Sequence, residues 1–256
     1  SRTENSLRNI KFTLVFRLLR TVVTFFTRKV FVMVLTQDYL GLDGIFSNIL
    51  SMLSLTELGI GSAISYSLYK PLAENDREQT AALMRLFGRA YRLIGIAVAL
   101  LGCALAPFLS KLIRDIPEIS HIYVIYILFV LNSALSYLSG YKQSLLIADQ
   151  RQYLTAACNN ALTVICHLAQ ALLLWITRNY FVYLAVQIGM TLLENVILSF
   201  WTHRLYPYIA TTPSSPLKGS ARKEIMRNTK AMLAHKVGGI VVLGTDQLLI
   251  SYFIGA

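Results

Sequence analysis

Apolar and polar residues follow one another along the chain in blocks. Each apolar block is long enough to cross a hydrocarbon core of about 30 Å as a helix, and short polar segments separate the blocks. The expected spans are residues 9–35, 45–69, 91–113, 121–147, 154–176, 181–201 and 231–255. This pattern predicts an all-α, polytopic membrane protein with about seven transmembrane helices.

Polar residues recur at helical spacing in the first span. On a helical projection they fall in a sector of about 80°, and the other faces carry mainly Leu, Val and Phe. The members of this stripe are Thr13, Arg17, Arg20, Thr21, Thr24 and Arg28. In one interpretation the arginines snorkel to the membrane interfaces. In the other, the stripe faces a cavity where guanidinium groups bind a diphosphate, because Arg presents a rigid fork to phosphate oxygens.

Two carboxylates lie in the middle of expected spans, where an unpaired charge is costly. Glu57, in the second span, is either a hydrogen-bonded packing residue or a functional one. Small residues that would let another helix approach it closely are Ser47, Ser51, Ser54 and Gly61. Glu194, in the sixth span, requires a partner. The cations available to it are Arg17, Arg20 and Lys236.

The later spans carry shorter polar rows, which either join helices by hydrogen bonds or line a substrate path. These rows are Asn132, Ser136 and Gly140; Asn159, Thr163 and Gln170; Gln187, Thr191 and Glu194; and, in the last span, the pairs His235 with Asp246 and Lys236 with Gln247. His167 has no carboxylate at ligand spacing, so we interpret it as a satisfied buried histidine.

Composition excludes most other classes of protein. Hydrophobic residues make up 55% of the chain and charged residues 14%, unlike an ordinary soluble domain. The three cysteines all lie in apolar runs, which argues against a disulfide framework or a cysteine metal site. No Ser/His/Asp order, phosphate-binding loop or metal-ligand cluster stands out. The sequence therefore predicts no enzyme activity, no metal site and no cofactor.

The net charge of +11 is distributed as the positive-inside rule requires. If the N-terminus is cytoplasmic, the cytoplasmic segments hold sixteen Lys and Arg residues, whereas the opposite side holds three, namely Lys111, Arg114 and Arg178. The basic excess therefore indicates membrane topology with the N-terminus in the cytoplasm. It does not indicate nucleic-acid binding.

Two expected cytoplasmic segments have distinctive sequences. Residues 75–92 predict an amphipathic helix, capped by Asn75 with Glu78, that lies on anionic lipid. Residues 207–220 are rich in proline and lead into a basic segment, which is typical of a linker between lobes.

Two stretches resemble a known family. LGLDGIFSNILSMLSLTELGIGSAISYSLYKPLA, residues 40–73, resembles the first loop and second helix of bacterial polysaccharide flippases. VGGIVVLGTDQLLISYFIG, residues 237–255, resembles their seventh helix. These flippases are lipid-linked oligosaccharide transporters of the multidrug/oligosaccharidyl-lipid/polysaccharide exporter superfamily. The resemblance implies a six-helix N-terminal lobe at 1–206, a cytoplasmic linker at 207–230 and, at 231–256, the first helix of a second lobe, so that the chain would be a fragment.

The resemblance also implies a function and a site. The expected function is to flip an undecaprenyl-diphosphate-linked oligosaccharide from the inner to the outer leaflet of a bacterial plasma membrane by alternating access. The expected diphosphate-binding residues are Arg17, Arg20, Arg28 and Lys236, and the expected polar-cavity or coupling residues are Glu57, Glu194, Asn159, Gln187 and Asp246. The implied partners are the lipid-linked substrate, anionic membrane lipid, a coupling ion (H⁺ or Na⁺) and polysaccharide assembly proteins.

Two alternative functions stay open. A multidrug exporter of the same superfamily would need carboxylates and few cations in its cavity. A structural membrane protein without transport activity would leave the charges inside the membrane without a purpose.

The charge asymmetry generates a topology prediction. A cysteine introduced at Glu118 should react with a membrane-impermeant thiol reagent added outside intact cells, whereas a cysteine at Ser6 or Ser214 should not. Labelling at position 214 from outside would contradict the orientation.

Overall fold

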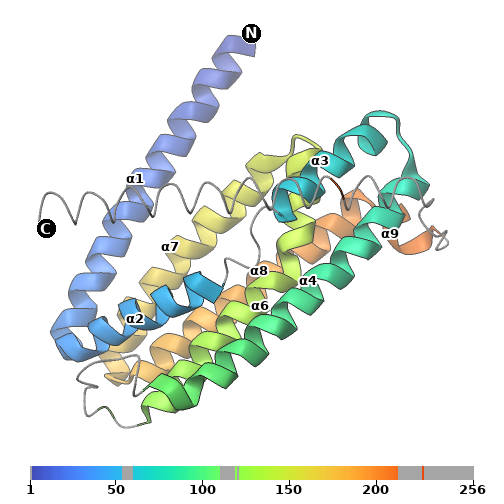
Figure 1. Cartoon of the computed structure of the whole chain (residues 1–256). Helices are drawn as coiled ribbons and strands as arrows, with labels where there is room; N and C mark the ends of the chain where they lie inside the picture. Colours follow the sequence, from blue (N-terminus) through green and yellow to red (C-terminus); the bar gives the residue numbers. More distant parts are fainter. Residues whose placement is uncertain (1, 54–59, 110–118, 120, 213–226, 228–256) are drawn as a thin grey trace, which may run out of the picture.

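A computed structural model describes residues 2–53, 60–109, 119, 121–212 and 227, with the side chains of α1 described from Leu18 onward. Helices form nearly all of this part of the chain, and it contains no β-strand, so the predicted all-α class is confirmed. The helices are α1 (Arg2–Val34), α2 (Gln37–Leu53), α3 (Ile60–Ala73), α4 (Arg77–Leu105), the 3₁₀ helix η2 (Ala106–Phe108), α6 (Ile122–Ala148), α7 (Gln152–Thr177), α8 (Tyr180–Leu205) and α9 (Tyr208–Thr211). Figure 1 shows them as one elongated bundle.

Four of these helices are long and apolar enough to cross a membrane: α4 continued by η2, α6, α7 and α8. They correspond to the expected spans 91–113, 121–147, 154–176 and 181–201. Their outer faces expose large apolar side chains, among them Leu100 in α4, Leu172 in α7 and Phe200 in α8. Apolar exposure over several helices indicates a surface that lipid covers, so the chain is a membrane protein.

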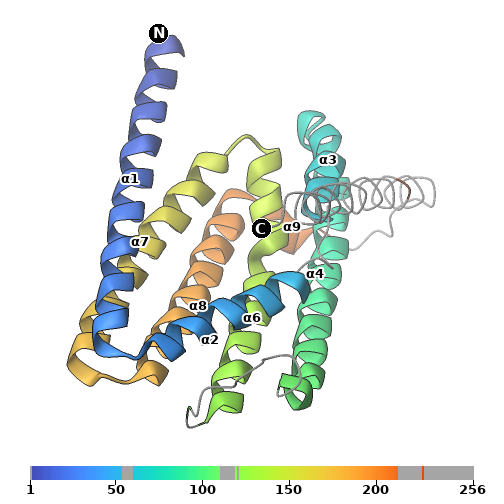
Figure 2. The ribbon, with the colours of Figure 1, turned by 60° about the vertical axis from the view of Figure 1, so that its left-hand side comes forward.

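The other three expected spans have different outcomes. The span at 9–35 lies within α1, whose N-terminal part extends beyond the bundle (Figures 1 and 2) and which is not among the four long apolar helices. The span at 231–255 lies outside the described residues. The expected count of about seven spans therefore stays a prediction.

The expected helix at 45–69 is described in two parts. The structure has α2 ending at Leu53 and α3 beginning at Ile60, with 54–59 outside the description. The two helices pack in different places: Phe46 of α2 contacts Tyr126 and Phe129 of α6, with ring centroids 5.1 and 5.6 Å apart, whereas Leu68 of α3 is buried beside α4.

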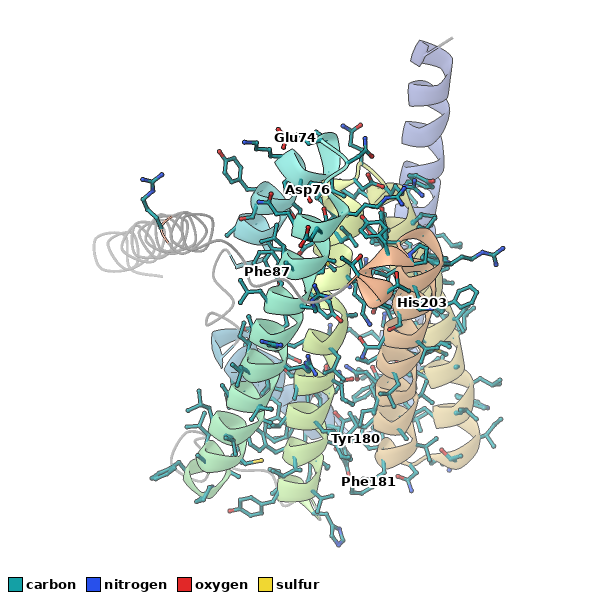
Figure 3. The ribbon with its side chains drawn as sticks, turned by 90° about the vertical axis from the view of Figure 1, so that its right-hand side faces the viewer. Glu74, Asp76, Phe87, Tyr180, Phe181 and His203 are labelled. Atoms are coloured by element: carbon teal, nitrogen blue, oxygen red, sulfur yellow. The ribbon has the colours of Figure 1, made fainter. Side chains whose placement is uncertain are left out.

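The bundle has two hydrophobic cores, one toward each end. One core joins α1, α2, α6, α7 and α8 around Phe31, Phe46 and Tyr180. The other joins α3, α4, α6, α8 and the segment after it around Leu68, Phe87 and Tyr206. Figure 3 shows Tyr180 and Phe181 at one end of the bundle and Glu74 and Asp76 at the other.

The amphipathic segment at 75–92 corrects two predictions. Asp76, not Asn75, caps the helix, because its carboxylate accepts a hydrogen bond from the Gln79 N–H at 2.9 Å. Asn75 takes a left-handed backbone conformation, with φ at 55°. The helix then continues without a break into the membrane-spanning part of α4, and its apolar face buries Leu83 and Phe87 in protein. Neighbouring helices therefore cover the face that was expected to lie on lipid.

The segments that connect helices at the Glu74 end are joined by polar contacts. The Tyr206 hydroxyl donates to the Asp149 carboxylate, and Arg151 Nε lies 2.7 Å from the same carboxylate. Burial and the hydrogen bond to Asp149 raise the pKa of Tyr206, which keeps the hydroxyl protonated. Arg85 donates to the Thr212 carbonyl at 2.8 Å. The first residues of the expected linker therefore lie against α4.

Glycines allow α4 and α6 to pack closely. A Cβ at Gly95 would lie 3.1 Å from the Ala134 carbonyl oxygen, and one at Gly102 would lie 2.7 Å from Val130. A Cβ at Gly140 would overlap the fully buried ring of Tyr91, with its Cδ1 at 2.8 Å. Small residues at these positions bring the two backbones together, as is usual for helices in membranes.

This packing predicts that Gly140→Ala destabilises the protein. The buried Tyr91 ring has little room to move, so the overpacking should cost about 1–3 kcal/mol. Gly189→Ala is the matched control, because a Cβ at that helical position meets nothing within 4 Å. Thermal unfolding of the purified protein in one detergent should show a lower midpoint for Gly140→Ala only. Equal midpoints for the two variants would contradict the packing account.

Candidate functional site

A polar cavity of about 320 Å³ lies among α1, α2, α6, α7 and α8. Apolar side chains form part of its wall, but most of the lining residues are polar. The polar and charged lining residues are Thr24, Thr27, Arg28, Asp43, Ser47, Asn132, Asn159, Thr163, Cys166, His167, Gln170, Tyr183, Gln187, Thr191 and Glu194. These residues come from separate polar rows that the fold brings to one place.

Hydrogen bonds between helices hold the walls together. The Thr27 hydroxyl lies 2.9 Å from the Val23 carbonyl oxygen and 3.0 Å from that of His167, so it joins α1 to α7. The Thr191 hydroxyl lies 2.8 Å from Asn132 Oδ1 and joins α8 to α6. Several side chains that line the cavity therefore also maintain its shape, which supports both interpretations of the polar rows.

The cavity is long because it follows two antiparallel helices. Gln170 of α7 donates to the Tyr183 carbonyl of α8 at 3.2 Å, which aligns the helices at one end. Asn159 and Glu194 lie eleven positions from these two residues, on α7 and α8 respectively, a rise of about 16 Å along each helix. We call these the aromatic end, around Tyr183, and the amide end, around Glu194.

The aromatic end contains an opposite-charge pair that the sequence analysis missed. Arg28 of α1 and Asp43 of α2 both line the cavity and attract one another, and the Tyr180 hydroxyl lies 3.4 Å from Asp43 Oδ1. Asp43 lies outside the four long apolar helices. Burial raises its pKa, while the Arg28 charge and the Tyr180 hydrogen bond act in the opposite direction. The signal available in the sequence was a carboxylate just before the expected second span.

Aromatic rings pack beside this charge pair. Phe31 makes edge contacts with Tyr180 and Tyr183, with ring centroids 5.7 and 5.1 Å apart. Tyr180 and Tyr183 stack at 5.7 Å, and Tyr39 lies 5.0 Å from Tyr180. These rings belong to the core at that end of the bundle, so the aromatic end is bounded by tightly packed apolar groups.

Glu194 at the amide end has a neutral partner. Its Oε1 accepts a hydrogen bond from Gln143 Nε2 of α6 at 3.2 Å. The sequence predicted a cation, namely Arg17, Arg20 or Lys236. The side chain of Arg17 and the whole of Lys236 lie outside the description, and Arg20 lies nearer His167 of α7. Gln143 was missed, although a polar residue in a long apolar run signals such a contact.

His167 was predicted to be a satisfied buried histidine, and Gln170 of the same helix forms a side-chain hydrogen bond with it. Its Nδ1 atom is buried and has no well-directed hydrogen bond among the described residues. Gln170, one turn along α7, and Arg20 lie near it. An unsatisfied buried nitrogen that borders a polar cavity is available to a ligand or to water.

The expected site residues are partly brought together. Arg28, Asn159, Gln187 and Glu194 all line the cavity. Arg20 is exposed and lies outside the described lining, on the part of α1 toward its free end. Arg17 lies on α1, but its side chain is not described. Glu57, Lys236 and Asp246 lie outside the described residues.

The charges in the cavity differ from those expected. Its described lining holds one arginine and two carboxylates, with uncharged hydroxyls and amides between them. Within the described part of the chain, no group of three His, Cys, Asp or Glu residues could hold a metal ion. The arrangement is therefore suited to hydrogen-bonding a polar solute, and Arg28 is its only described permanent cation.

Comparisons with protein-family models, with curated proteins and with solved structures found no match. The resemblance to polysaccharide flippases therefore depends on the two stretches of sequence quoted above.

Proposed function

We propose that the protein is a membrane transporter of lipid-linked oligosaccharides. The observation that carries this proposal is a polar cavity among helices whose outer faces are apolar. Polar groups are costly inside a membrane, so a cluster of them around a cavity marks a path for a polar solute. The resemblance to flippases supplies the class of solute.

In this proposal the substrate is an undecaprenyl-diphosphate-linked oligosaccharide in a bacterial plasma membrane. It moves from the inner to the outer leaflet by alternating access, and the lipid tail stays in the bilayer. No covalent bond is made or broken, so the protein is not an enzyme. The N-terminus is cytoplasmic, anionic lipids surround the basic cytoplasmic segments, H⁺ or Na⁺ drives the cycle, and polysaccharide assembly proteins use the exported product.

The arginines of α1 are the proposed diphosphate ligands. Arg28 lines the cavity, and Arg20 is exposed two turns earlier on the same helix. Arg17 follows the same helical stripe in the sequence. A guanidinium keeps its charge at any physiological pH and can bind two phosphate oxygens at once. The lipid diphosphate would therefore move along α1 between the arginines.

A second function is favoured by a specific observation. Asp43 and Glu194 give the described cavity more carboxylates than cations. A multidrug exporter that moves organic cations would use such carboxylates. The two functions differ in which charged residue is indispensable, since a cation exporter does not need Arg28.

The first function predicts that Arg28→Lys impairs export although the charge is conserved. Loss of the bidentate contact should lower export about tenfold or more, because a hydrogen bond to a charged group contributes about 1.5–3 kcal/mol. Lys29→Gln is the matched control, since Lys29 is exposed, adjacent and outside the described lining. The measurement is surface glycan in a flippase-deficient bacterium that expresses the protein, with protein level checked in the membrane fraction.

Normal glycan export by Arg28→Lys and by the Arg17→Lys, Arg20→Lys double variant would contradict the diphosphate assignment. The second function would be supported if the protein exported ethidium, and if Asp43→Asn or Glu194→Gln abolished that export while Arg28→Lys did not. Absence of glycan export by the wild-type protein would contradict the first function itself.

A further inference from the structure

The middle and the amide end of the cavity are lined by uncharged hydrogen-bonding groups from three helices. Asn132 comes from α6, Asn159 and Thr163 come from α7, and Gln187 and Thr191 come from α8. Each amide has two donor hydrogens and an acceptor oxygen, and each hydroxyl has both functions. This combination matches the closely spaced hydroxyl and acetamido groups of a sugar ring.

The amides retain hydrogen-bonding capacity in the structure. Asn132 Oδ1 lies within hydrogen-bond distance of Thr191, and the amide hydrogens of Asn132 can serve a ligand. Asn159 is exposed although it lies on a membrane-spanning helix, so its side chain opens into the cavity. Leu162 and Met190 supply apolar lining close to these groups. A pocket with apolar walls and a few convergent polar groups is typical of a small-molecule site.

The two ends of the cavity differ in charge. At the aromatic end, Arg28 faces Asp43, so the charges there offset one another. At the amide end, Glu194 accepts a hydrogen bond from the neutral side chain of Gln143, and the described lining there contains no cation. The described amide end is therefore negative. A ligand carboxylate or phosphate beside Glu194 would be repelled, because like charges repel more strongly in a site that is shielded from water.

We propose that the amide end of this cavity is a subsite for one uncharged or amino sugar residue, and that Glu194 excludes acidic sugars from it. This inference rests on the proposed transport function and deepens it, since it states which part of the substrate the cavity recognises. The diphosphate of the substrate then lies away from Glu194, toward the arginines of α1. The sugar lies on the opposite side, among α6, α7 and α8.

The test measures sugar binding directly, without transport. Saturation-transfer NMR on the purified protein in lipid nanodiscs would compare methyl N-acetylglucosaminide, which is neutral, with methyl glucosaminide, which is cationic, and methyl glucuronide, which is anionic. The wild-type protein should bind the first two at least about tenfold more tightly than the glucuronide. Glu194→Gln should raise the affinity for the glucuronide until it is close to the affinity for the neutral sugar. Glu74→Gln is the control, because it alters an exposed carboxylate just after the end of α3. It should leave the affinity for the glucuronide unchanged.

A second pair of variants separates loss of contact from loss of fold. Asn159→Leu should weaken binding of the neutral sugar about tenfold, whereas Asn160→Leu, next to it and outside the described lining, should leave binding unchanged. Both variants are first checked for wild-type elution on gel filtration. If Asn159→Leu does not elute as the wild type does, Asn159→Asp replaces it and should weaken glucuronide binding further.

Equal binding of the three sugars by the wild-type protein would overturn the proposal, as would a failure of all three to bind. These outcomes are independent of the export assay. If glycan export depends on Arg28 while the sugars are not discriminated, the subsite assignment fails and the transport function stands. If the sugars are discriminated but glycan is not exported, the transport function fails.

Discussion

The constraint on which this structure depends is that polar groups on membrane helices must find partners away from lipid. An unsatisfied backbone or side-chain group in hydrocarbon costs several kcal/mol, whereas the apolar faces of the same helices lose little by contact with lipid tails. The helices are therefore turned so that the polar rows of α1, α6, α7 and α8 face one another. Thr27, which bonds to the carbonyl of His167, and Thr191, which bonds to Asn132, are direct results of this arrangement. The cavity is the space that remains between the rows.

Rigid packing at both ends keeps that space open. Aromatic contacts around Phe31 and Tyr180 fix α1, α2 and α8 at one end, and close packing of α4 on α6 through Gly140 fixes the other part of the bundle. Membrane helices lack the hydrophobic drive that water gives to soluble proteins, so such close contacts and hydrogen bonds determine their arrangement. The charged groups of the cavity also have partners on other helices, since Arg28 attracts Asp43 and Glu194 accepts a hydrogen bond from Gln143.

The sequence predicted the all-α class and four long apolar helices correctly, because hydropathy over about twenty residues is a strong signal. Arg28, Asn159, Gln187 and Glu194, which the sequence marks as polar residues in apolar runs, line the cavity, and their roles stay predictions. The sequence was wrong about Asn75 as a cap and about the lipid-facing side of the amphipathic helix at 75–92. The cap depends on local backbone geometry, since Asn75 takes a left-handed conformation and Asp76 follows it. The covered face depends on which neighbouring helices pack there, and residue periodicity contains no such information. Asp43 and Gln143 were missed for the same reason, because their partners lie on other helices.

The central claim is that a cavity reached by water exists among helices whose outer surface meets lipid. The most direct measurement is the reactivity of single cysteines, in lipid nanodiscs, toward a charged, water-soluble thiol reagent. In a background with Cys103, Cys158 and Cys166 replaced by alanine, a cysteine at Asn159 in the cavity should react readily. A cysteine at Leu172, which is 62% exposed on the apolar outer face of the same helix, should not. Equal reactivity at the two positions, or reaction at 172 alone, would contradict the account.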